Sequence, residues 1–353
     1  MSDTGPVLLG PNQPERFYRG GKRITAFRAC AASEEVPQHE DHLPEDWVGS
    51  ATSVFGTQAD GLTRLPDGQL LRDAISADPM AYLGPQHART YGISPALLVK
   101  LLDAGERLPV HCHPDDPFAR QHLGSACGKT EAWIVIDASP GSEVHLGFRQ
   151  EVPADVLSGW VDTQSPAMLA ALNRVPVRPG DVILVPAGLP HAIGAGVFVV
   201  ELQQPTDFSI LLEWESFPID GLADGHLGLG YGLALDCVDR SAWDQDRLAG
   251  LRGTASAAQT GPVASVFPAA AGPYFAAQRI RPGQGSVAAG PGFAILIVLS
   301  GRGLLHTEHG GDLAVSRGMT ILMPYAAGGS ELSGDCELIR CLPPDGAAWS
   351  ASS

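Results

Sequence analysis

The sequence predicts a mostly β protein built as two barrels, with short helices inserted among the strands. The chain has 42 glycines and 29 prolines in 353 residues, and these separate many short apolar runs, as in β-rich proteins. A chain of this length also exceeds what one hydrophobic core usually supports. A Gly-x5-Pro spacing at residues 180–186 recurs at residues 318–324. We therefore expect two β domains, the second a weakened copy of the first.

Four segments depart from the strand pattern and predict helices. Residues 70–83 carry apolar residues at helical spacing, interrupted by Pro79. Residues 153–175 contain a clearer helix, with Ser165 as its N-cap and Pro166 as its first residue. Weaker helical patterns cover residues 229–236 and 242–251. This helical piece falls between the two halves of the metal motif described below, so we interpret it as an insertion in the first barrel.

The domain boundaries follow from composition. The segment from Ala255 to Gly272 is rich in Ala, Gly, Pro, Ser and Thr, which is typical of a linker. We expect a metal-binding domain at residues 1–218, a helical connection and linker at residues 219–258, and a second domain at residues 259–353. In the second domain, the apolar run Phe293–Leu299 predicts a strand.

Four side chains of the first domain predict a metal site. His111 and His113 lie two residues apart in a predicted strand, so both point to one face. His191 follows another strand and a tight turn of the form Pro-x-Gly. With the carboxylate of Glu131 from an intervening strand, these imidazoles can enclose a divalent cation such as Zn²⁺ or Fe²⁺. A lone histidine is more often a packing or surface residue, so the prediction depends on the combined spacing.

That spacing matches both halves of the cupin signature. Gly-x5-His-x-His begins at Gly105, and Gly-x5-Pro-x-Gly-x2-His begins at Gly180. The resemblance implies two cupin barrels, of the double-stranded β-helix or jelly-roll type. In the second one no histidine follows the Gly-x5-Pro spacing, and His306 and His309 are three residues apart, so on a strand they face opposite ways. We therefore expect a metal site in the first barrel only, and a degenerate, structural second barrel.

Charge and composition exclude several partners. The formal net charge is −16, and no basic stretch compensates it, which argues against nucleic acid as a partner. No apolar run approaches the roughly 18 residues of a membrane span, and the N-terminus has no apolar signal core. The six cysteines show no metal-binding or disulfide framework and fit reduced thiols. We expect a cytoplasmic protein that does not bind membranes, and an anionic substrate would need a local group of Lys or Arg.

Beyond the cupin signature, the chain resembles the class I mannose-6-phosphate isomerases (phosphomannose isomerases), particularly the shorter bacterial branch. The most specific segment is Gly-Lys-Thr-Glu-x-Trp at residues 128–133, placed after His-Pro-Asp-Asp at residues 113–116. Further matching segments are Pro-Glu-Asp-Trp-Val-Gly-Ser at 44–50, Leu-Val-Lys-Leu-Leu-Asp at 98–103, His-Ala-Ile-Gly at 191–194 and Glu-Leu-Gln-Gln-Pro-Thr-Asp at 201–207.

The resemblance implies a metal-dependent aldose–ketose isomerase, an intramolecular oxidoreductase acting on mannose 6-phosphate, fructose 6-phosphate or a related sugar. Its metal ligands map onto His111, His113, Glu131 and His191. At the first of these the family usually has Gln. Both residues are neutral, but a third imidazole shifts the preference toward softer transition metals. The resemblance implies Zn²⁺, with Fe²⁺, Mn²⁺ or Ni²⁺ as alternatives.

The same resemblance assigns the other site residues. Lys129 and Asp207 match the active-site Lys and Asp, and Trp47 and Ser50 match a loop near the substrate, although a core Trp and a turn Ser fit equally well. Glu201 is expected to contact the substrate or to support a ligand histidine. The sequence does not decide which group moves the proton. For a substrate phosphate, three basic residues are candidates: Arg19, Lys22 and Arg107.

One departure from the family pattern bears on function. The family has an arginine four positions after the aspartate that matches Asp207, and here Leu211 stands there. An alkyl group cannot replace a guanidinium in charge stabilisation. Either another arginine fills the space, or the substrate differs, or activity is weak. Two alternatives therefore stand beside the isomerase: a cupin metalloenzyme of another reaction, such as a dioxygenase, and a sugar-binding regulatory homologue without turnover.

Overall fold

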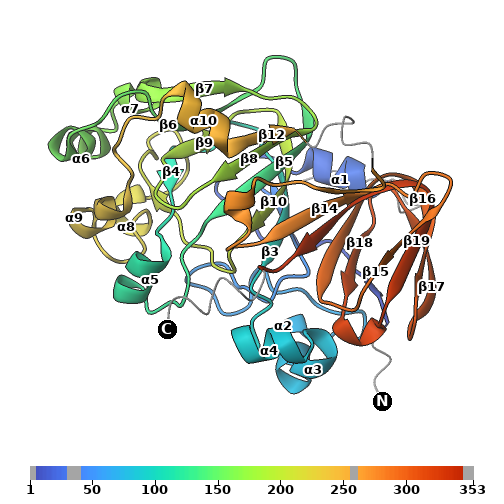
Figure 1. Ribbon diagram of the computed structural model, residues 1–353. Coiled ribbons are helices and arrows are strands. Elements are labelled where there is room, and N and C mark those ends of the chain that lie inside the picture. The colour runs from blue at the N-terminus through green and yellow to red at the C-terminus, as the bar shows by residue number, and fades with distance from the viewer. Residues whose placement is uncertain (1–4, 30–40, 255–260, 345–353) are drawn as a thin grey trace.

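The computed structural model describes residues 5–29, 41–254 and 261–344. Three antiparallel sheets form the framework, and short helices lie around them (Figure 1). The prediction of a mostly β fold is confirmed. The division at residues 218 and 258 stays a prediction.

The six-stranded sheet is the middle layer and has the order β12-β8-β5-β10-β3-β2. Its pairing registers place Trp47, Lys100, Glu201 and Trp133 side by side on four adjacent strands. A polar row therefore crosses one face of an otherwise apolar sheet. The strands are β2 (Glu45–Val48), β3 (Leu98–Asp103), β5 (Glu131–Ala138), β8 (Asp181–Val185), β10 (Val197–Gln203) and β12 (Arg252–Thr254).

A five-stranded sheet covers that polar face, with the order β11-β4-β9-β6-β7. Its strands are β4 (His111–Cys112), β6 (Glu143–Phe148), β7 (Leu172–Pro176), β9 (His191–Ile193) and β11 (Ile210–Leu211). In this sheet His111 lies opposite His191, and Leu211 lies opposite His111. The metal motif therefore sits between two facing sheets.

The eight-stranded sheet follows the order β1-β18-β16-β19-β14-β13, with β15 beside β19 and β17 beside β16. Its first strand comes from the N-terminus, because Val7 pairs with Leu322. The predicted linker at 255–272 lies partly outside the described residues; the rest contains an edge strand and a 3₁₀ turn, η2 (Ala269–Ala271). The strands are β1 (Val7–Leu8), β13 (Val263–Ser265), β14 (Ala276–Ile280), β15 (Ser286–Ala289), β16 (Ala294–Thr307), β17 (Gly311–Ser316), β18 (Thr320–Met323) and β19 (Ser330–Leu342).

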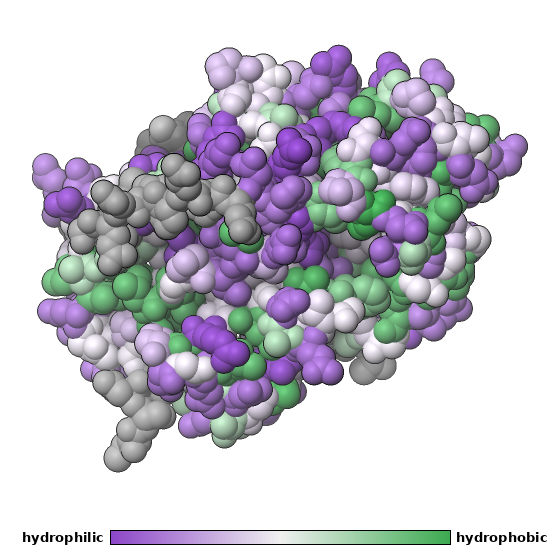
Figure 2. All heavy atoms as spheres, turned by 180° about the vertical axis from the view of Figure 1, so that it is seen from behind, coloured by the Kyte–Doolittle hydropathy of each residue, from purple (hydrophilic) through white to green (hydrophobic). Residues whose placement is uncertain are grey.

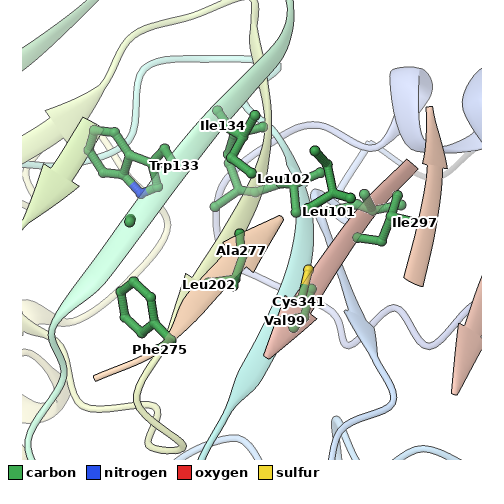
Figure 3. Close-up of a cluster of buried hydrophobic side chains, with 14 of the residues drawn as sticks. Val99, Leu101, Leu102, Trp133, Ile134, Leu202, Phe275, Ala277, Ile297 and Cys341 are labelled. Atoms are coloured by element: carbon green, nitrogen blue, oxygen red, sulfur yellow. The ribbon is translucent and has the colours of Figure 1, made fainter. Parts of the chain in front are cut away.

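One hydrophobic core joins the middle sheet to the eight-stranded sheet (Figure 3). Val99, Leu101 and Leu202 alternate with the polar row and so point to the opposite face of the middle sheet. There they belong to the same buried cluster as Ile297 and Cys341. Full burial of each such aliphatic side chain contributes roughly 1.5–3 kcal/mol, so this cluster holds the two parts together.

The helices lie close to their predicted positions. Pro79 divides the 70–83 segment into two helices, because Pro starts a helix more readily than it continues one. The 153–175 segment also forms two helices, and its last residues, from Leu172, are strand β7. The helices are α1 (Lys22–Ala29), α2 (Leu71–Ala77), α3 (Pro79–Tyr82), α4 (Pro85–Tyr91), α5 (Asp116–His122), α6 (Ala154–Thr163), α7 (Ala167–Ala171), α8 (Gly221–Asp224), α9 (Tyr231–Ala234) and α10 (Gln245–Leu251), with 3₁₀ turns η1 (Leu235–Cys237) and η3 (Tyr325–Ala327).

The surface is a mixture of polar and apolar residues. On the face opposite to that of Figure 1, hydrophilic residues gather along the middle of the molecule (Figure 2). In the described parts of the chain, no helix is both long and apolar enough to cross a membrane.

Candidate metal centre and adjoining pocket

A tight turn brings the third histidine to the other two. Gly188 has a φ of +84°, and its amide N–H donates to the carbonyl of His113 at 2.7 Å. A Cβ atom here would lie 2.9 Å from the carbonyl oxygen of Cys237, so only glycine fits. The turn before β9 is therefore tied directly to the end of β4, and His191 enters its strand beside His111.

The four predicted ligand side chains converge. One nitrogen from each of His111, His113 and His191 lies within 4.8 Å of the others, and these three form the one such histidine cluster in the described residues. Glu131 reaches them from the facing sheet: its Oε2 is 3.0 Å from His113 Nε2, and its Oε1 is 3.3 Å from His191 Nε2. All four side chains are buried.

Backbone hydrogen bonds define the tautomer of each histidine. The Nδ1 atoms face backbone carbonyl oxygens: Pro109 for His111 at 2.9 Å, Phe208 for His113 at 2.7 Å and Leu189 for His191 at 2.7 Å. A carbonyl only accepts, so each Nδ1 must carry the proton. In a neutral ring, Nε2 is then a bare lone pair that points into the cluster.

The protonation states of the cluster follow from burial and charge. Burial, followed by the charge of Lys129, lowers the pKa of His113 to about 3. Burial and the neighbouring imidazoles lower the pKa of His111 well below its ordinary value. For Glu131 burial alone would raise the pKa, but Lys129 and His113 hold it well below the usual range. Near neutral pH the imidazoles of His111 and His113 are therefore neutral, and the carboxylate of Glu131 is ionised.

This arrangement fits a bound cation. His113 Nε2, His191 Nε2 and Glu131 Oε2 are buried and make no hydrogen bond within the protein. Two of these acceptors stand only 3.0 Å apart with no hydrogen between them, which is unfavourable unless a positive charge lies beside both. Neutral imidazoles with one carboxylate are ligands that suit divalent transition metals. The three histidines and Glu131 therefore have the geometry and chemistry of a metal site.

Lys129 and Trp133 surround the carboxylate ligand. Lys129 Nζ lies 3.1 Å from Glu131 Oε2. The indole Nε1 of Trp133 lies 3.1 Å from both Glu131 Oε1 and Glu201 Oε2, so it links the ligand carboxylate to a second one. Burial and the nearby Glu131 charge raise the pKa of Glu201 to about 7.

Lys100 is the centre of a second charged group that sequence analysis missed. Its Nζ lies 3.4 Å from both Glu45 Oε2 and Glu201 Oε1, 4.0 Å from Asp207 Oδ1 and 4.8 Å from the ring centroid of Trp47. The chain has only three lysines, and two of them, Lys100 and Lys129, are buried here. A lysine in the middle of the apolar run Leu-Val-Lys-Leu-Leu was a signal that could have identified this residue.

Arg16 joins the same group from the N-terminal segment. Its Nη1 lies 3.3 Å from Asp207 Oδ2, and its Nε lies 3.7 Å from Glu45 Oε2. That Nε is buried and makes no hydrogen bond. Asp207 Oδ2 also accepts from the amide N–H of Phe55 at 3.2 Å. No sequence spacing relates residue 16 to residue 207, so only the tertiary fold reveals this pair.

These groups line one pocket beside the metal cluster. The lining includes His111, Glu131 and Leu211 together with the charged residues Arg16, Glu45, Lys100, Lys129, Glu201 and Asp207. The three phosphate candidates from the sequence are absent from it. Lys22 pairs with Asp41 at the surface, Arg107 forms a two-pronged ion pair with Glu213, and the backbone N–H of Arg19 donates to Glu106. Arg16 is the arginine that lines this pocket in the described residues.

Trp47 and Ser50 are not among the residues that line this pocket. Both are fully buried. The indole N–H of Trp47 donates to Glu45 at 2.6 Å, and the hydroxyl of Ser50 donates to the carbonyl of Thr52 at 2.8 Å. Neither side chain has a surface for a sugar. The structure therefore contains a core Trp and a turn Ser, and the indole N–H of Trp47 fixes the Glu45 carboxylate by a hydrogen bond.

Comparison with known proteins gives relatives of one kind. No family model matches the chain. The chain is 31% identical over 216 residues to a probable mannose-6-phosphate isomerase of Bacillus subtilis, an alignment that covers 58% of this chain and 59% of that protein. It is 36% identical over 137 residues to a mannose-6-phosphate isomerase of Streptococcus mutans, covering 36% and 41%. The chain thus matches about half the length of these curated relatives.

Solved structures match over nearly the whole chain. The crystal structure of the mannose 6-phosphate isomerase from Bacillus subtilis has a TM-score of 0.71 at 22% identity, covering 96% of this chain and 99% of that one. A mannose 6-phosphate isomerase bound with zinc and yttrium has a TM-score of 0.72 at 16% identity, covering 97% and 100%. At these identities the likeness establishes the fold.

Proposed function

We propose that this chain, which belongs to the mannose-6-phosphate isomerase family, is a metal-dependent aldose–ketose isomerase of mannose 6-phosphate and fructose 6-phosphate or a related sugar. The observation that carries the proposal is the pocket itself. Imidazole lone pairs and the carboxylate of Glu131 stand at its base, and two buried lysines, an arginine and three further carboxylates line its wall.

His111, His113, Glu131 and His191 would hold the metal, with Zn²⁺ favoured and Fe²⁺, Mn²⁺ or Ni²⁺ as alternatives. A divalent cation bound there supplies Lewis acidity that stabilises negative charge on the sugar's oxygens. Lys129 donates a hydrogen bond to a sugar oxygen, since its ammonium group already lies at the edge of the cluster. This places a fixed positive charge where the transition state develops a negative one.

The carboxylates supply the proton transfer between neighbouring carbons. Glu201 has a buried Oε1 without a hydrogen bond and a pKa raised to about 7 by burial and Glu131, so it can accept and return a proton near neutral pH. Asp207 is held by Arg16 and by the Phe55 amide, and it orients the sugar hydroxyls. Arg16 supplies the guanidinium that Leu211 cannot, and it gives the pocket a partner for an anionic substrate.

Metal analysis and a sugar panel test the proposal. The purified protein should contain about one transition metal ion per chain, and it should interconvert an aldose and a ketose among free and phosphorylated hexoses. His191→Ala should lose the metal and the activity, while His306→Ala, an exposed histidine of the eight-stranded sheet, should keep both. A protein that binds no transition metal after careful loading contradicts the proposal.

The third imidazole, His111, favours a second candidate, because three histidines and one glutamate are also ligands of cupin dioxygenases. Anaerobic loading with Fe²⁺ followed by oxygen-uptake measurement separates the two functions, since an isomerase consumes no oxygen.

The third candidate is a sugar-binding regulatory homologue without turnover, because Leu211 stands where the family has an arginine. In that case the metal-loaded protein binds sugars in calorimetry but converts none, and Leu211→Arg restores turnover only if the guanidinium is what is missing.

The proposal also includes the binding partners, the cellular location and the domain division of the protein. We expect a small sugar or sugar phosphate as the substrate, and neither nucleic acid nor membrane as a partner. A cytoplasmic location is supported by the absence of disulfides among the described cysteines. We also propose the division into a metal-binding domain at 1–218, a connection at 219–258 and a second domain at 259–353.

A further inference from the structure

Two cysteine thiols meet on the outer side of the strand that carries the first two histidines. The Sγ atom of Cys112 lies 3.5 Å from the Sγ atom of Cys237, although 125 residues separate them in the chain. Cys112 stands between His111 and His113 in β4, so its side chain points away from the histidine cluster. Neither cysteine lines the pocket beside that cluster. The pair is therefore a separate feature that the proposed isomerase reaction does not use.

The two thiols differ in exposure. Cys112 is fully buried, in a hydrophobic cluster with Phe148, Ile210 and Ala234. Cys237 is only partly buried and ends the 3₁₀ turn η1, which directly follows α9 (Figure 1). A small reagent therefore reaches the sulfur of Cys237 first. The sulfur of Cys112 is within reach of a partner that is already inside the protein, and Cys237 is such a partner.

A small movement brings the two sulfur atoms to bonding distance. Sulfur atoms in a disulfide are about 2.05 Å apart, so the pair has to approach by about 1.5 Å. Strand β4 is held by β11 and by β9. Cys237, in contrast, ends a turn of three residues. We therefore expect the movement to occur in η1 and to leave the histidines of β4 in place.

The turn before β9 lies against the same segment. The amide N–H of Asp239 donates to the carbonyl of Gly188 at 2.8 Å, and the amide N–H of Gly188 donates to the carbonyl of His113 at 2.7 Å. These contacts form a closed path from Cys112 through His113, Gly188 and Asp239 back to Cys237. A covalent bond between the two thiols would complete this path and hold the turn against β4.

We propose that Cys112 and Cys237 form a reversible disulfide, which locks the segment around η1 onto the back of the histidine cluster. Reversible disulfides in otherwise reduced compartments act as redox sensors. The inference does not rest on the isomerase activity, because its readouts are the covalent bond itself and the stability of the folded chain.

A small-molecule disulfide such as oxidised glutathione serves as the oxidant. The sulfur of Cys237 attacks one sulfur of the oxidant, whose S–S bond breaks, and one thiol leaves with the proton that Cys237 has lost. The sulfur of Cys112 then attacks the Sγ of Cys237. The mixed disulfide breaks, and the second thiol leaves with the proton from Cys112. The two cysteines lose two electrons in total, and the oxidant gains them as two thiols.

Mass spectrometry of the purified full chain after treatment with oxidised glutathione tests the proposal. The intact mass should fall by two hydrogen atoms with no glutathione attached, and a non-reduced digest should contain the two peptides of Cys112 and Cys237 joined. Dithiothreitol should restore the starting mass. The oxidised protein should melt about 5 °C or more above the reduced protein, because the bond restricts the unfolded chain across a long loop.

Three variants separate the pair from other thiols. Cys237→Ser should prevent both the bond and the rise in melting temperature, and its buried Cys112 should stay unmodified. Cys112→Ala should keep a lasting glutathione adduct on Cys237, which establishes the order of attack. Cys336→Ser, which changes a cysteine of the eight-stranded sheet, should behave like the parent protein. In the parent, oxidation should slow hydrogen exchange of the Gly188 amide about tenfold, because the turn opens less often.

Several outcomes overturn the proposal. An unchanged mass, or a lasting glutathione adduct on Cys237 of the parent protein, would show that the two sulfur atoms do not reach each other. A digest in which Cys112 or Cys237 is joined to a different cysteine would have the same meaning. A correct bond that leaves the melting temperature and the exchange of Gly188 unchanged would show that it locks nothing.

Discussion

The hydrogen bonds behind the three histidines decide what their rings can do. Each Nδ1 donates to a carbonyl, two of these within two residues of the ring, so local backbone geometry sets the tautomer of His111 and His191. His113 instead depends on Phe208, which lies 95 residues away. The lone pairs inside the cluster are therefore a property of the folded backbone as well as of residue type.

At the residue scale, Arg16 should be needed for activity on charged sugars. Arg16→Leu should lower kcat/KM for a phosphorylated substrate about a hundredfold, as when one charge-stabilising donor is removed from an active site. The loss should be smaller for the unphosphorylated sugar, and the metal content should not change. Arg19→Leu removes an arginine three residues away that lies outside the pocket, and it is the matched control in steady-state kinetics. Equal losses in both variants would contradict the assignment.

Glu45 should contribute to stability in a pH-dependent way. Burial alone would raise its pKa, but Arg16, Lys100 and the hydroxyl of Tyr18 lower it below its ordinary value. A lowered carboxyl pKa gives stability that is present above the unfolded pKa, about 4.3, and is lost as the pH falls toward the folded one.

Urea unfolding of Glu45→Gln at several pH values measures this effect. At pH 7 the variant should be less stable than the parent protein, and the difference should shrink below about pH 4 by up to 1.4 kcal/mol per pH unit. Glu151→Gln, which removes an exposed carboxylate, should show no such trend. A stability difference that is constant with pH would mean that Glu45 acts through packing rather than through its charge.

At the scale of elements, very short strands position the site. β4 has two residues and β9 has three, yet both are buried and tied on each side by sheet partners. The N-terminal β1 is equally short and belongs to the eight-stranded sheet. The segment between β1 and α1 contains Arg16, so the pairing of β1 helps to bring Arg16 to the pocket.

Leu9, the residue after β1, should anchor this segment. It is 3% exposed and its amide donates to Thr320 at 2.9 Å, whereas Leu8 is 45% exposed. Leu9→Ala should lower the free energy of unfolding by about 2–4 kcal/mol, because it leaves a cavity in the core. Leu8→Ala should change it by about 0.5 kcal/mol or less. Denaturant unfolding compares the two, and similar losses would mean that β1 does not depend on its buried side.

At the scale of the whole molecule, the middle sheet is shared. One face lines the pocket beside the histidine cluster and the other packs on the eight-stranded sheet, so a single layer couples the site to the last quarter of the chain. The eight-stranded sheet, which has no histidine cluster of its own in the described residues, buries the back of the sheet that presents Lys100 and Glu201.

The shared core predicts cooperative unfolding. In hydrogen exchange, amides of β10 and of β19 should open with similar free energies, because both strands contribute to one buried cluster. Ile297→Ala, which truncates a fully buried side chain between the sheets, should lower protection in both strands. If the variant lowers protection in β19 alone, the two parts unfold independently.

The sequence by itself determined the mostly β class and identified the four side chains that converge. These follow from local rules, since side chains alternate on strands and a Pro-x-Gly turn delivers a histidine at a set distance. The segment 128–133 added the carboxylate and Lys129 through resemblance, and the positions of the helices followed from apolar spacing and proline. Each of these motifs lies within about twenty residues of chain, although the ligand residues themselves come from segments between residues 111 and 191.

Only the tertiary structure decided which other charges enter the site. Arg16, Glu45 and Lys100 come from segments far apart in the chain, and no spacing relates them to Asp207, which the resemblance had already assigned to the site. The resemblance predicts that Trp47 lies near the substrate, but the side chain is buried. Its strand, β2, pairs with β3, and its indole N–H donates to Glu45. Strand pairing between distant segments sets these contacts, and such pairing depends on the packing of the whole chain rather than on any local pattern.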